Sequence, residues 1–175
     1  MSLRAAGPED AAVIAAMEQA AFADPWTPES VRGALWAPEY RIYVAETAPA
    51  CGSLYCGMTC GQAPAAVGYL IGRIVAGEAE LMRVACDQSC RRQGIGGALL
   101  DLFVKEAAEA GAQEMFLEVR AGNVPAQQLY RKKGFVQAGI RKNYYRHPQE
   151  DALVLQRHLG GADEAEDPFA PVRIS

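Results

Sequence analysis

Apolar and polar residues alternate along several short segments of the chain, a pattern typical of β-strands with one buried face. Residues 40–46 alternate in this way. Residues 67–75 and 79–86 form two apolar segments joined at Gly77, which predicts an antiparallel pair of strands. Further strands are predicted at residues 3–5, 114–119, 135–138 and 152–156.

Four helices are predicted between these strands from their start and stop residues. The first opens at residues 7–10, where a proline and two acids suit a first turn, and Thr27 is the predicted N-cap of the second. The third covers residues 96–110, because apolar side chains cover most of its surface and Gly111 ends it. Asn123 caps the fourth helix, which runs through Lys133.

This order of elements predicts a single α+β domain over residues 1–159, with one mixed central β-sheet and helices on both of its faces. Residues 47–66 are rich in Gly, Ala, Pro and Cys without a clean period, and we predict a long loop there. Residues 160–175 are acidic and then proline-bearing, which predicts a disordered tail.

The composition narrows the possible classes of function. Among 175 residues, 17 are Lys or Arg and 21 are Asp or Glu, a formal net charge of -4 that argues against nucleic acid as the main partner. No apolar run approaches the roughly 18 to 20 residues of a membrane span, and the N-terminus lacks the apolar core of a signal peptide. We therefore expect a cytoplasmic protein without a membrane partner.

The chain has five cysteines, an odd number that fits reduced thiols in that compartment. Cys51, Cys56 and Cys60 are clustered, which invites a zinc interpretation. However, their spacing contains no CxxC pair, and a fourth ligand would have to come from elsewhere. We expect free thiols and no metal.

A strand leads through a loop into a glycine-bearing helix start at residues 91–98. Free N–H groups at a helix N-terminus point outward and favour negative charge. Gly94, Gly96 and Gly97 would let a phosphate approach the backbone closely, because they lack Cβ atoms. Arg91 and Arg92 add charge and fork-shaped donors, so the segment fits a pyrophosphate.

Other interpretations of this turn compete with a pyrophosphate site. A P-loop would need a Gly-Lys-Ser/Thr ending, which is absent. A dinucleotide-binding turn is a closer match, since Glu118 lies where a ribose-binding acid belongs. Against it, Leu99 replaces the third glycine of that motif. A glycine-capped structural helix with solvated arginines is the simplest alternative, and it stays open.

The pattern Arg91-x-x-Gly94-x-Gly96 resembles the acetyl-CoA signature of the GNAT superfamily. Further motifs resemble one subgroup of it, the RimI-type ribosomal-protein alanine N-acetyltransferases. They are Pro25-Trp26-Thr27, Leu117-Glu118-Val119-Arg120, Asn123-x-x-Ala126-x-x-Leu129-Tyr130, Gly134-Phe135, and Asn143-Tyr144-Tyr145 with Glu150-Asp151-Ala152 after it. The match runs from about Arg4 to Leu159 and implies a GNAT-like α+β fold.

The resemblance implies acetyl-CoA as the cosubstrate. Backbone N–H groups at the start of the third helix would hold its pyrophosphate, the strand before that helix would run beside its pantetheine arm, and an asparagine would contact it near the thiol end. The cofactor-binding residues implied in this way are Val84, Ala85, Cys86, Arg91, Arg92, Gln93, Gly94, Ile95, Gly96, Gly97 and Asn123.

The resemblance also implies that Glu118 is the base and Tyr130 the acid of acetyl transfer. An α-amine with a pKa near 7.7 to 8 is about one tenth neutral at pH 7, whereas a lysine amine costs about 3 to 4 kcal/mol more to deprotonate. A glutamate of ordinary pKa therefore suits an α-amine better. From the residues alone, ordinary helix packing of Tyr130 and an exposed strand position for Glu118 are the simpler explanations.

In this subgroup the acceptor is the N-terminal alanine of a small-subunit ribosomal protein. The resemblance implies that Trp26, Tyr144 and Tyr145 line the acceptor groove, and the net negative charge would help to attract a basic protein tail. Two other functions stay open: a GNAT enzyme that acetylates a small-molecule amine, and a non-catalytic acetyl-CoA-binding module.

Three features depart from the subgroup. Arg83 stands where a small polar or apolar residue is usual, which leaves the acceptor preference open. Gly97 stands where an arginine is common, so one phosphate contact would be missing unless Arg91 supplies it. The predicted loop over residues 47–66 is longer than expected for the subgroup.

Overall fold

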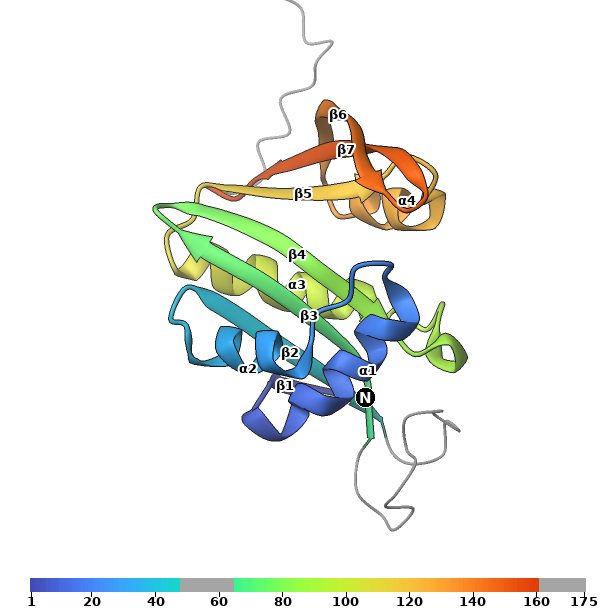
Figure 1. The fold of residues 1–175 in the computed structure, drawn as a ribbon. Coiled ribbons are helices and arrows are strands. Elements are labelled where there is room, and N and C mark those ends of the chain that lie inside the picture. Colours follow the sequence, from blue (N-terminus) through green and yellow to red (C-terminus); the bar gives the residue numbers. More distant parts are fainter. Residues whose placement is uncertain (48–64, 161–175) are drawn as a thin grey trace, which may run out of the picture.

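A computed structural model describes residues 1–47 and 65–160 of the chain. The described residues form one seven-stranded mixed sheet with the strand order β1-β2-β3-β4-β5-β7-β6, and helices cover both of its faces (Figure 1). This confirms the predicted fold class. The elements are β1 (Ser2–Ala5), α1 (Ala11–Ala21), α2 (Pro28–Trp36), β2 (Tyr40–Thr47), β3 (Ala65–Val75), β4 (Glu78–Cys86), α3 (Ile95–Glu109), β5 (Glu114–Arg120), α4 (Val124–Lys132), β6 (Val136–Arg146) and β7 (Gln149–His158).

Most of the predicted loop over residues 47–66 lies outside the described residues, with its three cysteines, and so does the predicted tail from residue 161 onward. Only the ends of that loop are described, where Thr47 closes β2 and residues 65–66 open β3. The predicted roles of the loop and the tail therefore stay predictions.

Local hydrogen bonds explain where the helices begin. The Thr27 side chain accepts from the backbone N–H of Ser30 at 3.2 Å, and Asn123 Oδ1 accepts from the N–H of Ala126 at 3.3 Å, so both predicted N-caps are confirmed. The first helix starts later than predicted, at Ala11, because residues 8–10 form a short 3-10 turn before it.

The sheet opens between β4 and β5. These two strands are parallel neighbours, but they pair only from Glu78 to Leu81 on β4 and from Glu114 to Leu117 on β5. On the other edge of β4, the register shifts as Ile71 pairs with Arg83 and Gly72 pairs with Leu81, so Met82 is an extra residue. Such a bulge bends its strand. The second half of β4 therefore stays with β3 and leaves β5 (Figure 1).

Two apolar clusters hold the helices against the two faces of the sheet. The larger one packs α3 and α4 on the sheet through buried side chains such as Leu99, Phe103, Met115 and Leu117. The smaller one packs α1 and α2 on the opposite face, with Ile14, Val31, Tyr69 and Ile71 at its centre. Each face of the sheet is thus buried by its own pair of helices.

The sheet ends in a long hairpin that the sequence did not predict at this length. The predicted strand at residues 135–138 is the start of β6, which continues to Arg146 and pairs with β7 across a turn at residues 147–148. Because β6 is an edge strand with nearly every residue exposed, its apolar alternation is weak. The motif Asn143-Tyr144-Tyr145 therefore lies in a strand, next to a bulge between Arg141 and Tyr145.

The packing of β3 on α3 yields a test of the fold. A Cβ added at Gly72 would overlap the ring of Phe103, which is fully buried. We expect Gly72→Ala to lower the free energy of unfolding by about 1 to 3 kcal/mol, measured by urea denaturation. The matched control is Gly139→Ala in β6, where the added Cβ meets nothing within 4 Å. Equal stability of the two variants would contradict this packing.

Candidate active site

A groove of about 450 Å³ lies where β4 and β5 part. Its walls come from the second half of β4, the end of β5, the start of α3 and the inner side of α4. It brings together many of the residues predicted from the sequence. These are Val84, Ala85 and Cys86 of β4, Gly96 of α3, Glu118 of β5, Asn123 and Tyr130 of the α4 segment, and Tyr145 of β6.

The start of α3 presents backbone amides at one end of this groove. Gly94 is the N-cap, with a φ of 82° that favours glycine. The first bond of the helix runs from the N–H of Ala98 to the carbonyl of Gly94 at 2.9 Å, so the geometry of a helix leaves the amides of residues 95–97 without intrahelical acceptors. Arg91 and Arg92 are exposed beside this turn, and Arg92 has a φ of 63°. The turn thus has the free amides and the cations that an anion site needs.

Not every residue predicted at this turn faces the groove. The Ile95 side chain is buried in the larger apolar cluster, so only its backbone amide is available to a ligand. Gly97 is buried against α4, where an added Cβ would lie 3.5 Å from Leu129 Cδ1 and 3.8 Å from Lys133 Nζ. The Lys133 ammonium therefore lies close to Gly97, although it is 2.5 Å from Asp101.

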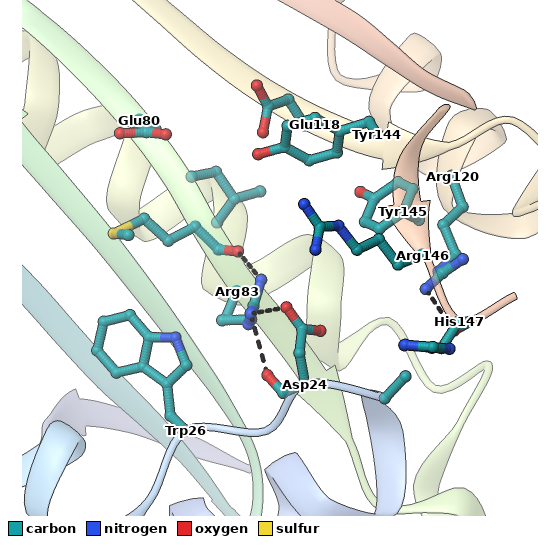
Figure 2. A pocket seen from close by; sticks show the side chains of 13 residues that line it. Asp24, Trp26, Glu80, Arg83, Glu118, Arg120, Tyr144, Tyr145, Arg146 and His147 are labelled. Carbon is teal, nitrogen blue, oxygen red and sulfur yellow. Dashed lines mark hydrogen bonds and ion pairs between the residues drawn. The ribbon is translucent and has the colours of Figure 1, made fainter. Parts of the chain in front are cut away.

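A second cavity, the outer pocket, adjoins the groove, and Figure 2 shows the side chains that line it. Its walls are the α1–α2 loop with Asp24 and Trp26 on one side and the β6 end with Tyr144 and Arg146 on the other. Glu118 lines both the groove and the outer pocket. The two cavities therefore share a wall that includes this carboxylate, and all three residues predicted for the acceptor groove line the outer pocket.

Glu118 is held by two neighbours from β6. Its Oε1 lies 2.8 Å from Nε of Arg141, and the Tyr144 side chain lies beside the same carboxylate. The Glu118 carboxylate, together with burial, raises the pKa of Tyr144 to about 12. Tyr144 also packs edge-on against Tyr145, with ring centroids 5.1 Å apart. The long hairpin thus orients the carboxylate that sequence analysis singled out.

Tyr130 reaches the groove from α4, on the side of the larger apolar cluster. Its side chain is 7% exposed, and its ring packs edge-on against Phe135 with centroids 5.9 Å apart. Burial raises the pKa of the Tyr130 phenol, and the nearby Tyr145 adds to this effect. The phenol therefore stays protonated at neutral pH, as a proton donor must.

A buried carboxylate fixes the α1–α2 loop that forms one wall of the outer pocket. Glu18 is fully buried, accepts a hydrogen bond from the Tyr69 hydroxyl, and accepts another from the backbone N–H of Trp26 at 3.1 Å. Arg83 Nε lies 3.5 Å from Glu18 Oε2, and its Nη2 lies 3.4 Å from Asp24. Burial raises the pKa of Glu18 although these partners oppose the change. Arg83, a departure from the subgroup, thus ties β4 to the loop.

Several residues of the outer pocket were missed by sequence analysis. Arg120 lies two residues after Glu118 on the same face of β5, a position that strand alternation could have indicated. Arg146 and His147 directly follow the paired tyrosines. Asp24 had no signal in the sequence, because its place depends on the buried contacts of the α1–α2 loop.

Within residues 1–47 and 65–160, no group of three or more His, Cys, Asp or Glu side chains could hold a metal ion. Cys86 and Cys90 are free thiols. The clustered Cys51, Cys56 and Cys60 lie outside the described residues. None of the described helices has the length and apolar character that a membrane span requires.

Comparisons with known proteins agree with this geometry. The family model described as the Acetyltransferase (GNAT) family matches residues 13–135. A ribosomal protein bS18-alanine N-acetyltransferase of Escherichia coli is 37% identical over 106 residues, which cover 59% of this chain and 72% of that protein. A Bacillus subtilis protein that carries the same name provisionally is 33% identical over 147 residues, 84% of this chain and 88% of its own length.

The fold comparison gives the same result. The crystal structure of the ribosomal-protein-S18-alanine N-acetyltransferase from Escherichia coli superimposes with a TM-score of 0.74 and 28% sequence identity, covering 94% of this chain and 97% of that one. Arabidopsis thaliana NAA60 in complex with acetyl-CoA has a TM-score of 0.76 at 16% identity, which shows a shared fold.

The buried Glu18 provides a test of the polar contacts that fix the α1–α2 loop. A carboxyl group whose folded-state pKa is raised stabilises the fold at low pH, and that contribution is lost as the pH rises through the folded-state pKa. We therefore expect the wild type to lose stability relative to Glu18→Gln as the pH rises above the ordinary glutamate pKa of about 4.3, measured by urea denaturation at several pH values. A difference between the two proteins that does not change with pH would contradict the raised pKa.

Proposed function

This chain belongs to the acetyltransferase (GNAT) family, and on that premise we propose that it acetylates the α-amine of a protein N-terminus, with Glu118 as the base and Tyr130 as the acid. It is an acetyl-CoA-dependent N-acetyltransferase. The observation that carries the proposal is the position of Glu118 in the wall that the groove and the outer pocket share. One cavity can hold the acetyl donor and the other the acceptor.

The groove has the groups that acetyl-CoA needs. Free amides at the start of α3, with Arg91 and Arg92 beside them, suit a diphosphate. The edge of β4 from Val84 to Cys86 has left β5 and can run beside an extended arm. Asn123 lines the groove although its side chain also caps α4, so both roles hold together. When bound there, acetyl-CoA supplies an acetyl thioester.

Glu118 would take the proton that the acceptor amine must lose. The amine nitrogen forms a bond to the acetyl carbon while the bond from that carbon to sulfur breaks. An α-amine is about one tenth neutral at pH 7, so a carboxylate already paired with Arg141 can accept its proton directly or through a water molecule. Tyr144 and Arg141 keep the carboxylate in one orientation during this step.

Tyr130 would donate a proton toward the sulfur as it leaves. Burial keeps its phenol protonated, and its place in the groove puts it on the α4 side, opposite β4. Its raised pKa makes complete transfer to a thiolate, whose thiol has a pKa near 8.5, costly by more than about 2 kcal/mol. Tyr130 therefore acts first as a hydrogen-bond donor, and the proton moves as negative charge gathers on the sulfur.

The outer pocket fits a peptide better than a small amine. It lies between the α1–α2 loop and β6, is open to the surface, and is lined by the aromatic side chains of Trp26, Tyr144 and Tyr145. Relatives that are 33% and 37% identical to this chain are named for the alanine of ribosomal protein bS18. We extend that chemistry to this chain, with an N-terminal alanine of a protein such as a small-subunit ribosomal protein as the acceptor.

An acetylation assay tests this function. With acetyl-CoA and a peptide that begins with Ala-Gln, mass spectrometry should find one acetyl group on the α-amine. We expect Glu118→Gln and Tyr130→Phe each to lower kcat by about tenfold to a thousandfold, because each removes one proton-transfer group. The dissociation constant for acetyl-CoA, measured by calorimetry, should stay within a few-fold of the wild type.

Matched controls separate chemistry from folding. Glu114→Gln lies on the same strand and face as Glu118 but outside the groove, and Tyr43→Phe removes another buried phenol. Both should retain nearly full activity. An unmodified peptide beside an acetylated polyamine would remove the proposed acceptor, and full activity of both catalytic variants would remove the proposed mechanism.

A further inference from the structure

Three carboxylates and three arginines line the outer pocket, but they do not all pair with one another. Each of its three carboxylates has a cationic partner: Asp24 lies 3.4 Å from Arg83, Glu80 lies 3.1 Å from Arg73, and Glu118 lies 2.8 Å from Arg141. The lining carboxylates are therefore already neutralised by arginines before any acceptor enters.

The cations of the same pocket fall into two groups. Arg83 is tied to Glu18 and Asp24, and Arg120 lies 3.1 Å from Glu150 with its guanidinium 4.0 Å from the centre of the Tyr145 ring. Arg146 has no ion pair with any carboxylate of the described residues, and its side chain extends from the end of β6 into the pocket (Figure 2). Among the described residues, Arg146 is therefore the lining arginine without a carboxylate partner.

The position of Arg146 on β6 determines which residue of an acceptor peptide its side chain would contact. The acceptor amine must lie at Glu118, which Tyr144 contacts from β6. The Cα of Arg146 is two residues farther along that strand than the Cα of Tyr144, a spacing of about 7 Å at the rise of a β-strand. An extended acceptor advances about 3.3 to 3.6 Å per residue, so its second or third residue lies at this distance from its amine.

We propose that Arg146 makes the outer pocket selective for protein N-termini that carry Asp or Glu at the second or third position. This inference rests on the proposed function and specifies its acceptor. A carboxylate there would form a charge-assisted hydrogen bond with the guanidinium of Arg146, in a pocket that Trp26 and Met82 also line. A basic second residue would instead meet a cation whose neighbouring carboxylates are already paired.

The net negative charge of the chain favours basic acceptors instead, but it acts over a longer distance than Arg146 does. The formal charge of -4 attracts basic tails from a distance, and salt screens that attraction beyond about 8 Å. Inside a half-closed pocket, groups a few ångströms apart interact more strongly than they would in bulk water. The local charge of Arg146 therefore decides between acceptors that have reached the pocket.

The test compares four peptides that share one sequence apart from their second and third residues, beginning Ala-Glu-Ala, Ala-Ala-Glu, Ala-Gln-Ala and Ala-Arg-Ala. For the wild type, we expect kcat/KM for the better acidic peptide to exceed that for the Ala-Arg-Ala peptide by at least about fivefold. Arg146→Glu should abolish or reverse this preference, and Arg146→Gln should reduce it, while KM for acetyl-CoA stays unchanged.

The matched control is Arg32→Glu, which changes the net charge equally but alters an exposed arginine on α2 that pairs with Glu29. It should keep the wild-type preference, and thermal melting should show all variants folded. Equal or better use of the Ala-Arg-Ala peptide by the wild type, or a preference that Arg146→Glu leaves intact, would overturn the inference while the proposed function stands. If no peptide is acetylated, the proposed function fails first.

Discussion

The early end of the pairing between β4 and β5 is the constraint on which the whole site depends. The two strands share a ladder only as far as Leu81 and Leu117, and the extra residue at Met82 keeps the rest of β4 with β3. If the ladder continued, the groove would close, and Glu118 and Tyr130 would have no shared cavity. The edge of β4 that β5 leaves unpaired lines this opening. The start of α3, which follows β4 in the chain, brings its amides to the same place.

The hairpin of β6 and β7 forms one part of the acceptor side of the site. β6 supplies both groups that hold Glu118, Arg141 and the Tyr144 hydroxyl, and it forms the wall of the outer pocket that faces the α1–α2 loop. That loop is fixed from the other side by the buried Glu18, through Tyr69 and Arg83. The acceptor side of the site is therefore built from two segments that are distant in the sequence and are each held by buried or paired charges.

How much could be predicted from the sequence depended on the range of the interactions involved. Thr27, Asn123 and Gly94 act within one helical turn, so the helix starts were visible in the sequence. The full length of β6 was not, because an exposed edge strand has no clear alternation. The free charge of Arg146 could not be predicted either, since it depends on which carboxylates other arginines have already paired. The roles of Glu118 and Tyr130 came from resemblance, and the structure adds that both line one groove.

The central claim is that the acetyl donor lies in the opening between β4 and β5. A crystal structure of the chain with coenzyme A tests it most directly. The account predicts a diphosphate against the amides at residues 94–97, an arm along residues 84–86, and a sulfur between the side chains of Glu118 and Tyr130. A coenzyme bound elsewhere, or a β4–β5 ladder that continues past Leu81 and closes the groove, would contradict it.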